Sequence, residues 1–180
     1  LCPDLLCITF NGLSKSHIIC GFRCGWMCIS GPDSFTVPMI ETVTKLASMR
    51  LCGNALSQLV IPAALEDFES TQSMMVPGGR LYEQREAVCR ALDTIPGITY
   101  VKNHAAFYLF PKLDIEKFGI TNDKQFAMDY LHSKHVMIIP GSGFNWKEPD
   151  HFRIVMLPDP ERMKKAMEDL GDFLSDYHQN

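Results

Sequence analysis

The sequence of 180 residues lacks several features that mark particular classes of protein. No apolar run reaches the roughly 18 to 20 residues that a membrane-spanning helix needs, and no basic segment followed by an apolar one opens the chain as a secretory signal would. Lysine and arginine form no block, and the formal net charge is −4, so neither nucleic acid nor an anionic membrane is an expected partner. With 46% hydrophobic and 21% charged residues, the composition is that of an ordinary globular protein.

The seven cysteines include no Cys-x-x-Cys pair, and none lies at zinc-site spacing with a histidine. Cys20, Cys24 and Cys28 recur every four residues, a spacing that could suggest a metal cluster. They fall within apolar, strand-like sequence, however, where a free cysteine acts as a small hydrophobe. The six histidines show no triad or metal pattern, so we expect no metal site. Unpaired thiols fit a reducing compartment and predict a cytoplasmic protein.

Apolar runs and periodic apolar stripes alternate along the chain, which predicts an α/β protein. Strands are expected at 5–10, 22–29, 98–101, 106–110, 136–139 and 151–156, and helices at 39–47, 56–64, 81–92, 126–131 and 163–177. Asn11-Gly12 indicates a turn after a buried first strand. Asp33, Ser34 or Thr36 would cap the first helix, Asn122 the fourth, and Asp159, followed by Pro160, the last.

The order of elements divides the chain into parts. Residues 98–180 predict a small C-terminal α/β domain with a partly antiparallel sheet, and residues 76–97 a connecting helix. Residues 1–75 indicate the end of a larger α/β domain, because two strands and two helices cannot bury both faces of a sheet. The chain also starts at Leu1 and enters an apolar stretch almost at once, so we expect a piece of a longer protein.

One segment, 11–27, combines a lysine with a well-spaced arginine. Ser14 and Lys15 are followed by Gly21-Phe22-Arg23-Cys24-Gly25. A lysine that forms an imine needs a neutral amine and an aldehyde held close by, and a phosphorylated aldehyde also needs donors at its phosphate. The hydroxyl of Ser14 and the planar fork of Arg23 can supply those donors. The alternative is a solvated loop lysine and an arginine in a strand ion pair.

This pattern resembles the lysine motif of class I/II (fold type I) pyridoxal-phosphate (PLP) aminotransferases, in which a small residue and lysine precede Gly-x-Arg-x-Gly. The resemblance continues along the chain and is to bacterial alanine (glutamate–pyruvate) aminotransferases in particular. It is carried further by the stretches 46–52, 77–85, 144–146 and 151–155. It implies the end of the PLP-transferase large domain followed by the small C-terminal domain.

The resemblance also implies roles for individual residues. Lys15 would be the Schiff-base lysine and the base that moves a proton between the α-carbon of the amino acid and C4′ of PLP. Arg23 would bind the cofactor phosphate, with Ser14 as a second donor. Arg153, in an apolar strand, would bind the substrate α-carboxylate, because a buried arginine must find an anion; the alternative is a structural ion pair. The substrates would be alanine and a 2-oxo acid, 2-oxoglutarate or pyruvate.

The same resemblance predicts a homodimer, with Arg50 and Asn54 near the subunit interface, and a helix-end role for Arg50 is the alternative. The family's acid at the pyridine nitrogen, its Asn and its Tyr lie well before the lysine, but only 14 residues precede Lys15. We therefore expect this chain alone to be inactive. Two other functions are considered: a PLP-dependent carbon–sulfur lyase, and a non-catalytic effector or dimerisation module.

Overall fold

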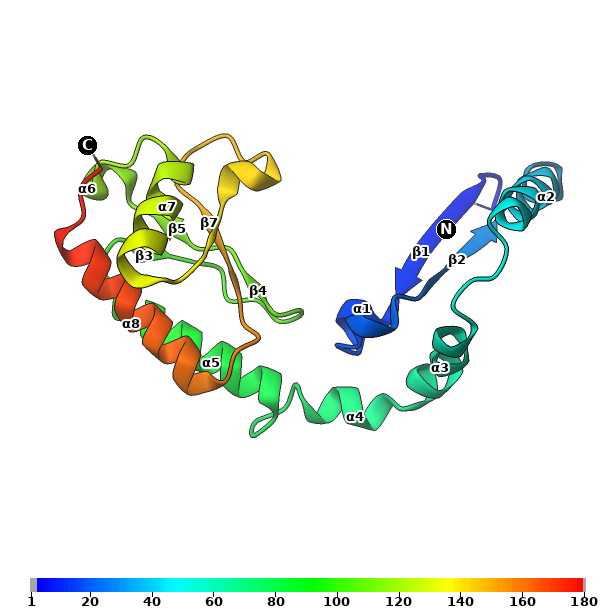
Figure 1. Cartoon of the computed structure of the whole chain (residues 1–180), viewed down its shortest axis with the longest axis horizontal. Helices are drawn as coiled ribbons and strands as arrows, with labels where there is room; N and C mark the ends of the chain where they lie inside the picture. Colours follow the sequence, from blue (N-terminus) through cyan, green and yellow to red (C-terminus); the bar gives the residue numbers. More distant parts are fainter. Residues whose placement is uncertain (1–2, 180) are drawn as a thin grey trace. The chain divides into compact units, whose positions relative to one another are not determined.

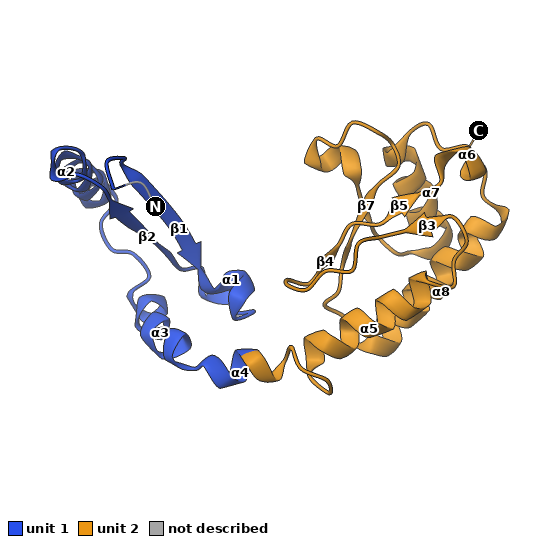
Figure 2. Cartoon of the chain, turned by 180° about the vertical axis from the view of Figure 1, so that it is seen from behind, with its two compact units in different colours: residues 1–71 blue, residues 72–180 orange. Residues whose placement is uncertain are grey.

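The computed structural model describes residues 3–179. The chain divides into two compact units, unit 1 (Leu1–Thr71) and unit 2 (Gln72–Asn180), which Figure 2 distinguishes by colour.

Unit 1 is built around a two-stranded antiparallel hairpin (Figure 1). Strands β1 (Cys7–Gly12) and β2 (Gly25–Ser30) pair from Cys7↔Ser30 to Gly12↔Gly25. Between them lie helix α1 (Leu13–Ser16) and the 3-10 turn η1 (Cys20–Phe22). Helices α2 (Asp33–Arg50), α3 (Ala55–Glu66) and α4 (Phe68–Ser73) follow, and α4 runs into unit 2.

Two predictions for the local structure of unit 1 are wrong. Asn11 and Gly12 form no turn but end β1, because they pair with Trp26 and Gly25. A Cβ at Gly25 would lie 2.7 Å from the Asn11 carbonyl oxygen, so the close approach of the strands requires glycine there. Helix α2 starts at Asp33, with Pro32 at the N-cap position and no side-chain cap, so none of the predicted capping residues caps it.

The apolar side chains of unit 1 are mostly exposed, contrary to the predicted burial of the first strand. Cys7 to Phe10 are all exposed, with Phe10 at 75%. Among the described residues of this unit, Leu13 is the one hydrophobic side chain that is fully buried. Exposed apolar surface of this extent is typical of a face that packs against another part of a protein.

Unit 2 contains the principal core of the described chain. Its helices are α5 (Arg80–Leu92), α6 (Ile115–Phe118), α7 (Asp123–Lys134) and α8 (Pro160–Asp176), and its strands are β3 (Ile98–Thr99), β4 (Tyr108–Leu109), β5 (Lys112–Leu113), β6 (Ile139–Pro140) and β7 (Phe152–Val155), with the 3-10 turn η2 (Gly141–Phe144) after β6. The sheet order is β4-β7-β6, with a separate β3-β5 pair, and every pairing among the described residues is antiparallel.

The α/β prediction is confirmed, and most of the helix signals of unit 2 are correct. Asn122 caps α7 by accepting hydrogen bonds from the backbone N–H groups of Lys124 and Gln125. Asp159 caps α8 by accepting one from Arg162 N–H, and Pro160 begins that helix as predicted. The strands are shorter than predicted. The apolar run 136–139 contributes little to the sheet because β7 pairs with only Ile139 and Pro140.

Helix α8 closes the core of unit 2. Its buried stripe of Met163, Met167, Leu170 and Leu174 belongs to one cluster with Phe126 and Tyr130 of α7 and with β7. The Tyr130 hydroxyl donates a hydrogen bond of 2.8 Å to the Ala166 carbonyl, which satisfies the one polar atom of a fully buried ring.

Two methionines of unit 2 provide a matched test of this core. Met167 is 2% exposed and Met137 is 72% exposed. We expect Met167→Ala to lower the free energy of unfolding by about 2–5 kcal/mol, through lost burial and a cavity. Met137→Ala should change it by less than about 0.5 kcal/mol. Urea unfolding followed by Trp146 fluorescence in a Trp26→Phe background measures both, and equal losses would contradict the assignment of α8 to the core.

Candidate active site

The connection between β1 and β2 contains three of the four predicted site residues. Ser14 and Lys15 lie in α1, directly after β1, and Arg23 lies two residues before β2. Because Gly12 and Gly25 pair, the two strands bring Lys15 and Arg23 to the same end of the hairpin. Lys15 and Arg23 are exposed and Ser14 is half-buried, while Leu13 anchors the start of the connection.

Arg23 has a backbone conformation that is uncommon for a residue with a side chain. Its φ of 51° and ψ of 44° place it in the left-handed region. Its Nη1 donates a hydrogen bond of 2.9 Å to the Cys20 carbonyl, which closes the turn η1. That bond uses one of five guanidinium donors, so the side chain retains donors for an anion. His135 and Asn145 adopt the same conformation at the ends of α7 and η2, so this backbone state ends a helical turn and does not by itself mark a functional site.

The strand side of this connection is tied to α3. The Cys24 thiol donates to the carbonyl of buried Ser57 at 3.4 Å, and the Asn54 side chain caps α3 by accepting from Ser57 N–H. An open cavity of about 480 Å³ lies here, lined by Arg23, Trp26 and Gln58 among others. Cys24, like every cysteine within the described residues, is an unpaired thiol.

The fourth predicted residue, Arg153, lies in β7 of unit 2. This strand alternates strictly: Phe152 and Ile154 are buried and Arg153 and Val155 are half-buried on the opposite face. Tyr108 pairs with Val155 and therefore stands on the same face as Arg153. The guanidinium carbon of Arg153 lies 4.8 Å from the centre of the Tyr108 ring and 4.6 Å from that of Phe144. Contacts of this length are cation–π interactions.

The structure does not contain the ion pair that was the alternative role for Arg153. Within residues 3–179, no carboxylate lies within salt-bridge distance of this guanidinium. Its Nε is buried and has no hydrogen-bond partner. A buried donor without a partner is costly. Because Nε is buried, the terminal nitrogens are the part of the guanidinium that an anion can reach. These nitrogens can bind a carboxylate bidentately.

Two buried aspartates hold the segment that carries Phe144, and sequence reasoning missed both. Asp123 accepts hydrogen bonds from Ser142 N–H at 2.7 Å and from Ser142 Oγ at 2.9 Å, which fixes η2. Asp150 Oδ1 accepts from Trp146 Nε1 at 2.8 Å and contacts His151 Nδ1 at 2.6 Å. No sequence motif identifies these two aspartates, because the contacts with their partners depend on irregular chain segments that the sequence does not predict.

The surroundings of Asp150 favour the ionised form of its carboxyl group. Burial by itself would raise the pKa of the Asp150 carboxyl, but the hydrogen bonds from His151 and Trp146, together with the nearby charges, hold the pKa below its usual range. Lys112 Nζ adds an ion pair at 3.4 Å to Oδ2. Asp150 is therefore an ionised hydrogen-bond acceptor at neutral pH.

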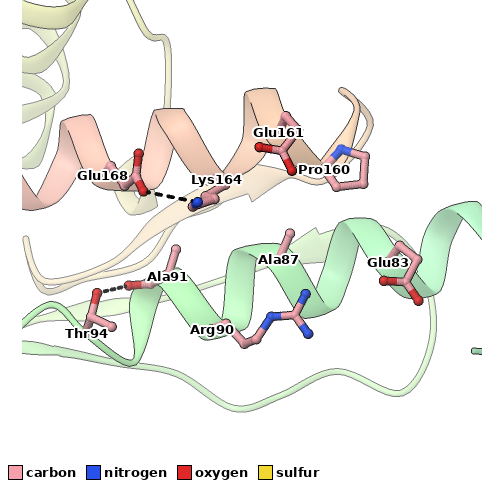
Figure 3. Close-up of a pocket in the computed structure, with 9 residues that line it drawn as sticks. All are labelled: Glu83, Ala87, Arg90, Ala91, Thr94, Pro160, Glu161, Lys164 and Glu168. Atoms are coloured by element: carbon pink, nitrogen blue, oxygen red, sulfur yellow. Dashed lines mark hydrogen bonds and ion pairs between the residues drawn. The ribbon is translucent and has the colours of Figure 1, made fainter.

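A second cavity, of about 520 Å³, lies between α5 and α8 (Figure 3). Alanines 87 and 91 line it, and charged side chains of both signs surround it, including Arg90 and a Lys164–Glu168 pair at 3.8 Å. None of the four predicted site residues lines it.

Among the described residues, no group of His, Cys, Asp or Glu is arranged to hold a metal ion. Nor does any helix within residues 3–179 combine the length and apolar composition needed to cross a membrane.

Comparison with known proteins assigns the chain to a family. The profile of the family "Aminotransferase class I and II" matches residues 2–170. The glutamate-pyruvate aminotransferase AlaA of Haemophilus influenzae is 47% identical over 179 residues, which are 99% of this chain and 44% of that protein. The chain thus spans less than half the length of this curated relative.

Solved structures agree in fold. A crystal structure of an aminotransferase from Escherichia coli is 45% identical and superposes with a TM-score of 0.92, over 99% of this chain and 44% of the other. The alanine aminotransferase of Pyrococcus furiosus is 34% identical, with a TM-score of 0.80 over 96% of this chain and 43% of the other. On these matches, which run along nearly its whole length, the chain belongs to the class I and II aminotransferase family.

Proposed function

We propose that this chain is the C-terminal portion of a PLP-dependent aminotransferase that exchanges an amino group between alanine and a 2-oxo acid, 2-oxoglutarate or pyruvate. The names of its relatives support the reaction: glutamate-pyruvate aminotransferase at 47% identity and alanine aminotransferase, from Mycobacterium bovis, at 44%. The observation that carries the substrate class is the Arg153 guanidinium, which has no carboxylate partner among the described residues.

The residues of the β1–β2 connection fit two groups of PLP, its aldehyde and its phosphate. An aldehyde needs a primary amine, which Lys15 provides, and a phosphate dianion needs a guanidinium, which Arg23 provides. Both lie at one end of the hairpin, and among the described residues the Arg23 guanidinium donates one hydrogen bond, to the Cys20 carbonyl. Ser14, beside Lys15, would be a second donor to the same phosphate.

When bound, PLP supplies the electron sink that stabilises negative charge at the α-carbon of an amino acid. In this proposal Lys15 would hold the cofactor in the resting enzyme, and its Nζ, free of the cofactor once the amino acid is bound, would take the proton from the α-carbon. Arg23 and Ser14 would hold the phosphate, which keeps the cofactor in a fixed orientation. Arg153 would bind and orient the substrate through its α-carboxylate.

The remaining assignments belong to the same proposal. Residues 1–75 form the end of the large cofactor-binding domain, 76–97 the connecting helix and 98–180 the small domain. The enzyme would be a cytoplasmic homodimer. Because the chain spans 44% of its relative's length, the acid at the pyridine nitrogen would come from the rest of the enzyme, and the chain alone would bind PLP without turnover.

The cofactor assignment predicts a selective covalent attachment. Chain incubated with PLP, reduced with borohydride and digested should have its PLP label on Lys15, as located by mass spectrometry. Lys15→Ala should remove that label, and Arg23→Gln should raise the PLP concentration for half-labelling by roughly ten-fold, through loss of a charge-assisted contact. Lys45→Ala, at an exposed lysine of α2, is the matched control. Even labelling of all lysines, unchanged in both variants, would contradict the proposal.

The substrate assignment predicts that 2-oxoglutarate binds at Arg153. Titration followed by the backbone amide resonances of β7 and Phe144 gives its dissociation constant. Arg153→Gln should raise that constant by roughly ten-fold or more, and Arg153→Lys should recover part of the loss because it keeps the charge but not the planar fork. Arg90→Gln removes an exposed arginine of α5 that lines a different cavity from Arg153, and it should have no effect. Equal effects of the Arg153 and Arg90 variants would rule out a specific carboxylate site.

A further inference from the structure

Phe144 is the less constrained of the two rings that enclose the Arg153 guanidinium. Tyr108 lies in β4 and is fixed by pairing with Val155 of β7. Phe144 ends the short turn η2 and is 44% exposed, so the sheet does not fix it. Its position 4.6 Å from the guanidinium carbon must therefore be fixed by other contacts.

The first set of contacts holds the beginning of η2. Gly141 N–H donates to the His151 carbonyl at 2.8 Å, and a Cβ at Gly141 would meet that same oxygen at 2.8 Å. Asp123 binds both the N–H and the hydroxyl of Ser142. Backbone bonds from Asn145 N–H to the Ser142 carbonyl at 3.1 Å and from Trp146 N–H to the Gly141 carbonyl at 3.2 Å then close the turn. These contacts fix the backbone of η2 and leave the direction of the Phe144 ring to be set by side chains.

The second set holds the far end and converges on Asp150. Trp146 follows Phe144 by two residues, and its indole N–H donates to Asp150 Oδ1. His151 contacts the same oxygen and stacks on Phe110, with ring centres 4.9 Å apart. Phe110 in turn meets the edge of Phe144, with ring centres 6.1 Å apart. Asp150 is thus connected to Phe144 in two ways. It binds Trp146, which is close to Phe144 in the chain, and it contacts His151, which stacks on the Phe110 ring that packs against Phe144.

We propose that Asp150 is a positioning residue: by anchoring Trp146 and His151 it holds Phe144 against Arg153, and so sets the orientation in which the guanidinium meets a carboxylate. The inference rests on the proposed function for its consequence in binding. The anchoring itself is independent of that function and is tested separately.

The physical advantage is a guanidinium with restricted freedom. An arginine side chain loses considerable rotamer entropy when it is fixed. A side chain already held between two rings loses less of it on binding, so the bidentate contact forms at lower cost. If Phe144 moves away, water reaches one face of the guanidinium and the interaction with a carboxylate weakens.

The structural test uses the Arg153 Nε–H resonance of the whole chain. Two rings close to the guanidinium should shift this resonance away from that of an exposed arginine. Asp150→Ala should move it at least half of the way back, and Asp150→Asn, which keeps an oxygen acceptor, should retain most of the shift. Asp129→Ala is the control, because it removes a carboxylate that binds Gln125 and Tyr177 in the same unit but has no contact with η2 among the described residues.

Trp146→Phe is the second variant. It tests whether the bond between Trp146 and Asp150 holds Phe144 against Arg153, even if Asp150→Ala does not fold. It removes the indole donor at a residue 45% exposed and keeps an aromatic ring. It should also move the Arg153 resonance toward the exposed value. If the folded variants of Asp150 and Trp146 both leave the resonance where it is in the wild type, Asp150 does not position Phe144 and the proposal is overturned.

The binding test separates this inference from the proposed function. The dissociation constant for 2-oxoglutarate should rise by roughly ten-fold in Asp150→Ala and much less in Asp150→Asn. If the wild-type chain does not bind 2-oxoglutarate although the Arg153 resonance responds as expected, the proposed function fails and the anchoring stands. If the resonance responds and 2-oxoglutarate binds equally well in all variants, the claimed effect on carboxylate binding is overturned.

Discussion

The alternation of side chains along β7 is the constraint that determines where the Arg153 guanidinium lies. Phe152 and Ile154 are committed to the core of unit 2, so Arg153 between them can only emerge on the opposite face. A shift of register by one residue would turn the guanidinium into that core, where an unpaired charge is prohibitively costly. Packing of two apolar side chains thereby fixes the direction of a charged one. The neighbouring strand then places Tyr108 beside it through the same pleat.

The two units reach their geometry by different means. Unit 2 has a closed core, and its site residues are displayed on strands and turns that this core supports. Unit 1 has little core of its own within the described residues, and its hairpin depends on main-chain pairing between two glycine-ended strands. The exposed apolar residues of β1, α2 and α3 suit burial against further protein, which agrees with a chain that spans under half of its relative's length.

Sequence reasoning succeeded where the signal is local. The caps Asn122 and Asp159 act within three residues, and the stripe of α8 repeats at helical spacing, so both were predictable. It failed at Asn11-Gly12, because a local turn signal is overridden by pairing with residues 25 and 26, which no local pattern reveals. Lys15, Arg23 and Arg153 were identified through resemblance to a family. Asp150 was missed because Trp146 lies in irregular chain and Lys112 and His151 are brought together by a β-bridge, and no local pattern reveals either.

Arg23 and Arg153, the two arginines predicted as site residues, each carry a local energetic cost. Arg23 adopts a left-handed backbone conformation, and Arg153 buries an Nε–H without an acceptor. Either feature is expected to cost on the order of 1–3 kcal/mol. These costs are not confined to the two arginines, because Gln84 Oε1 and Asn103 Oδ1 are also buried without a partner, and five other non-glycine residues of the described chain have a positive φ. What distinguishes the two arginines is that each keeps guanidinium donors without a partner among the described residues, and a cation with unused donors is suited to an anion.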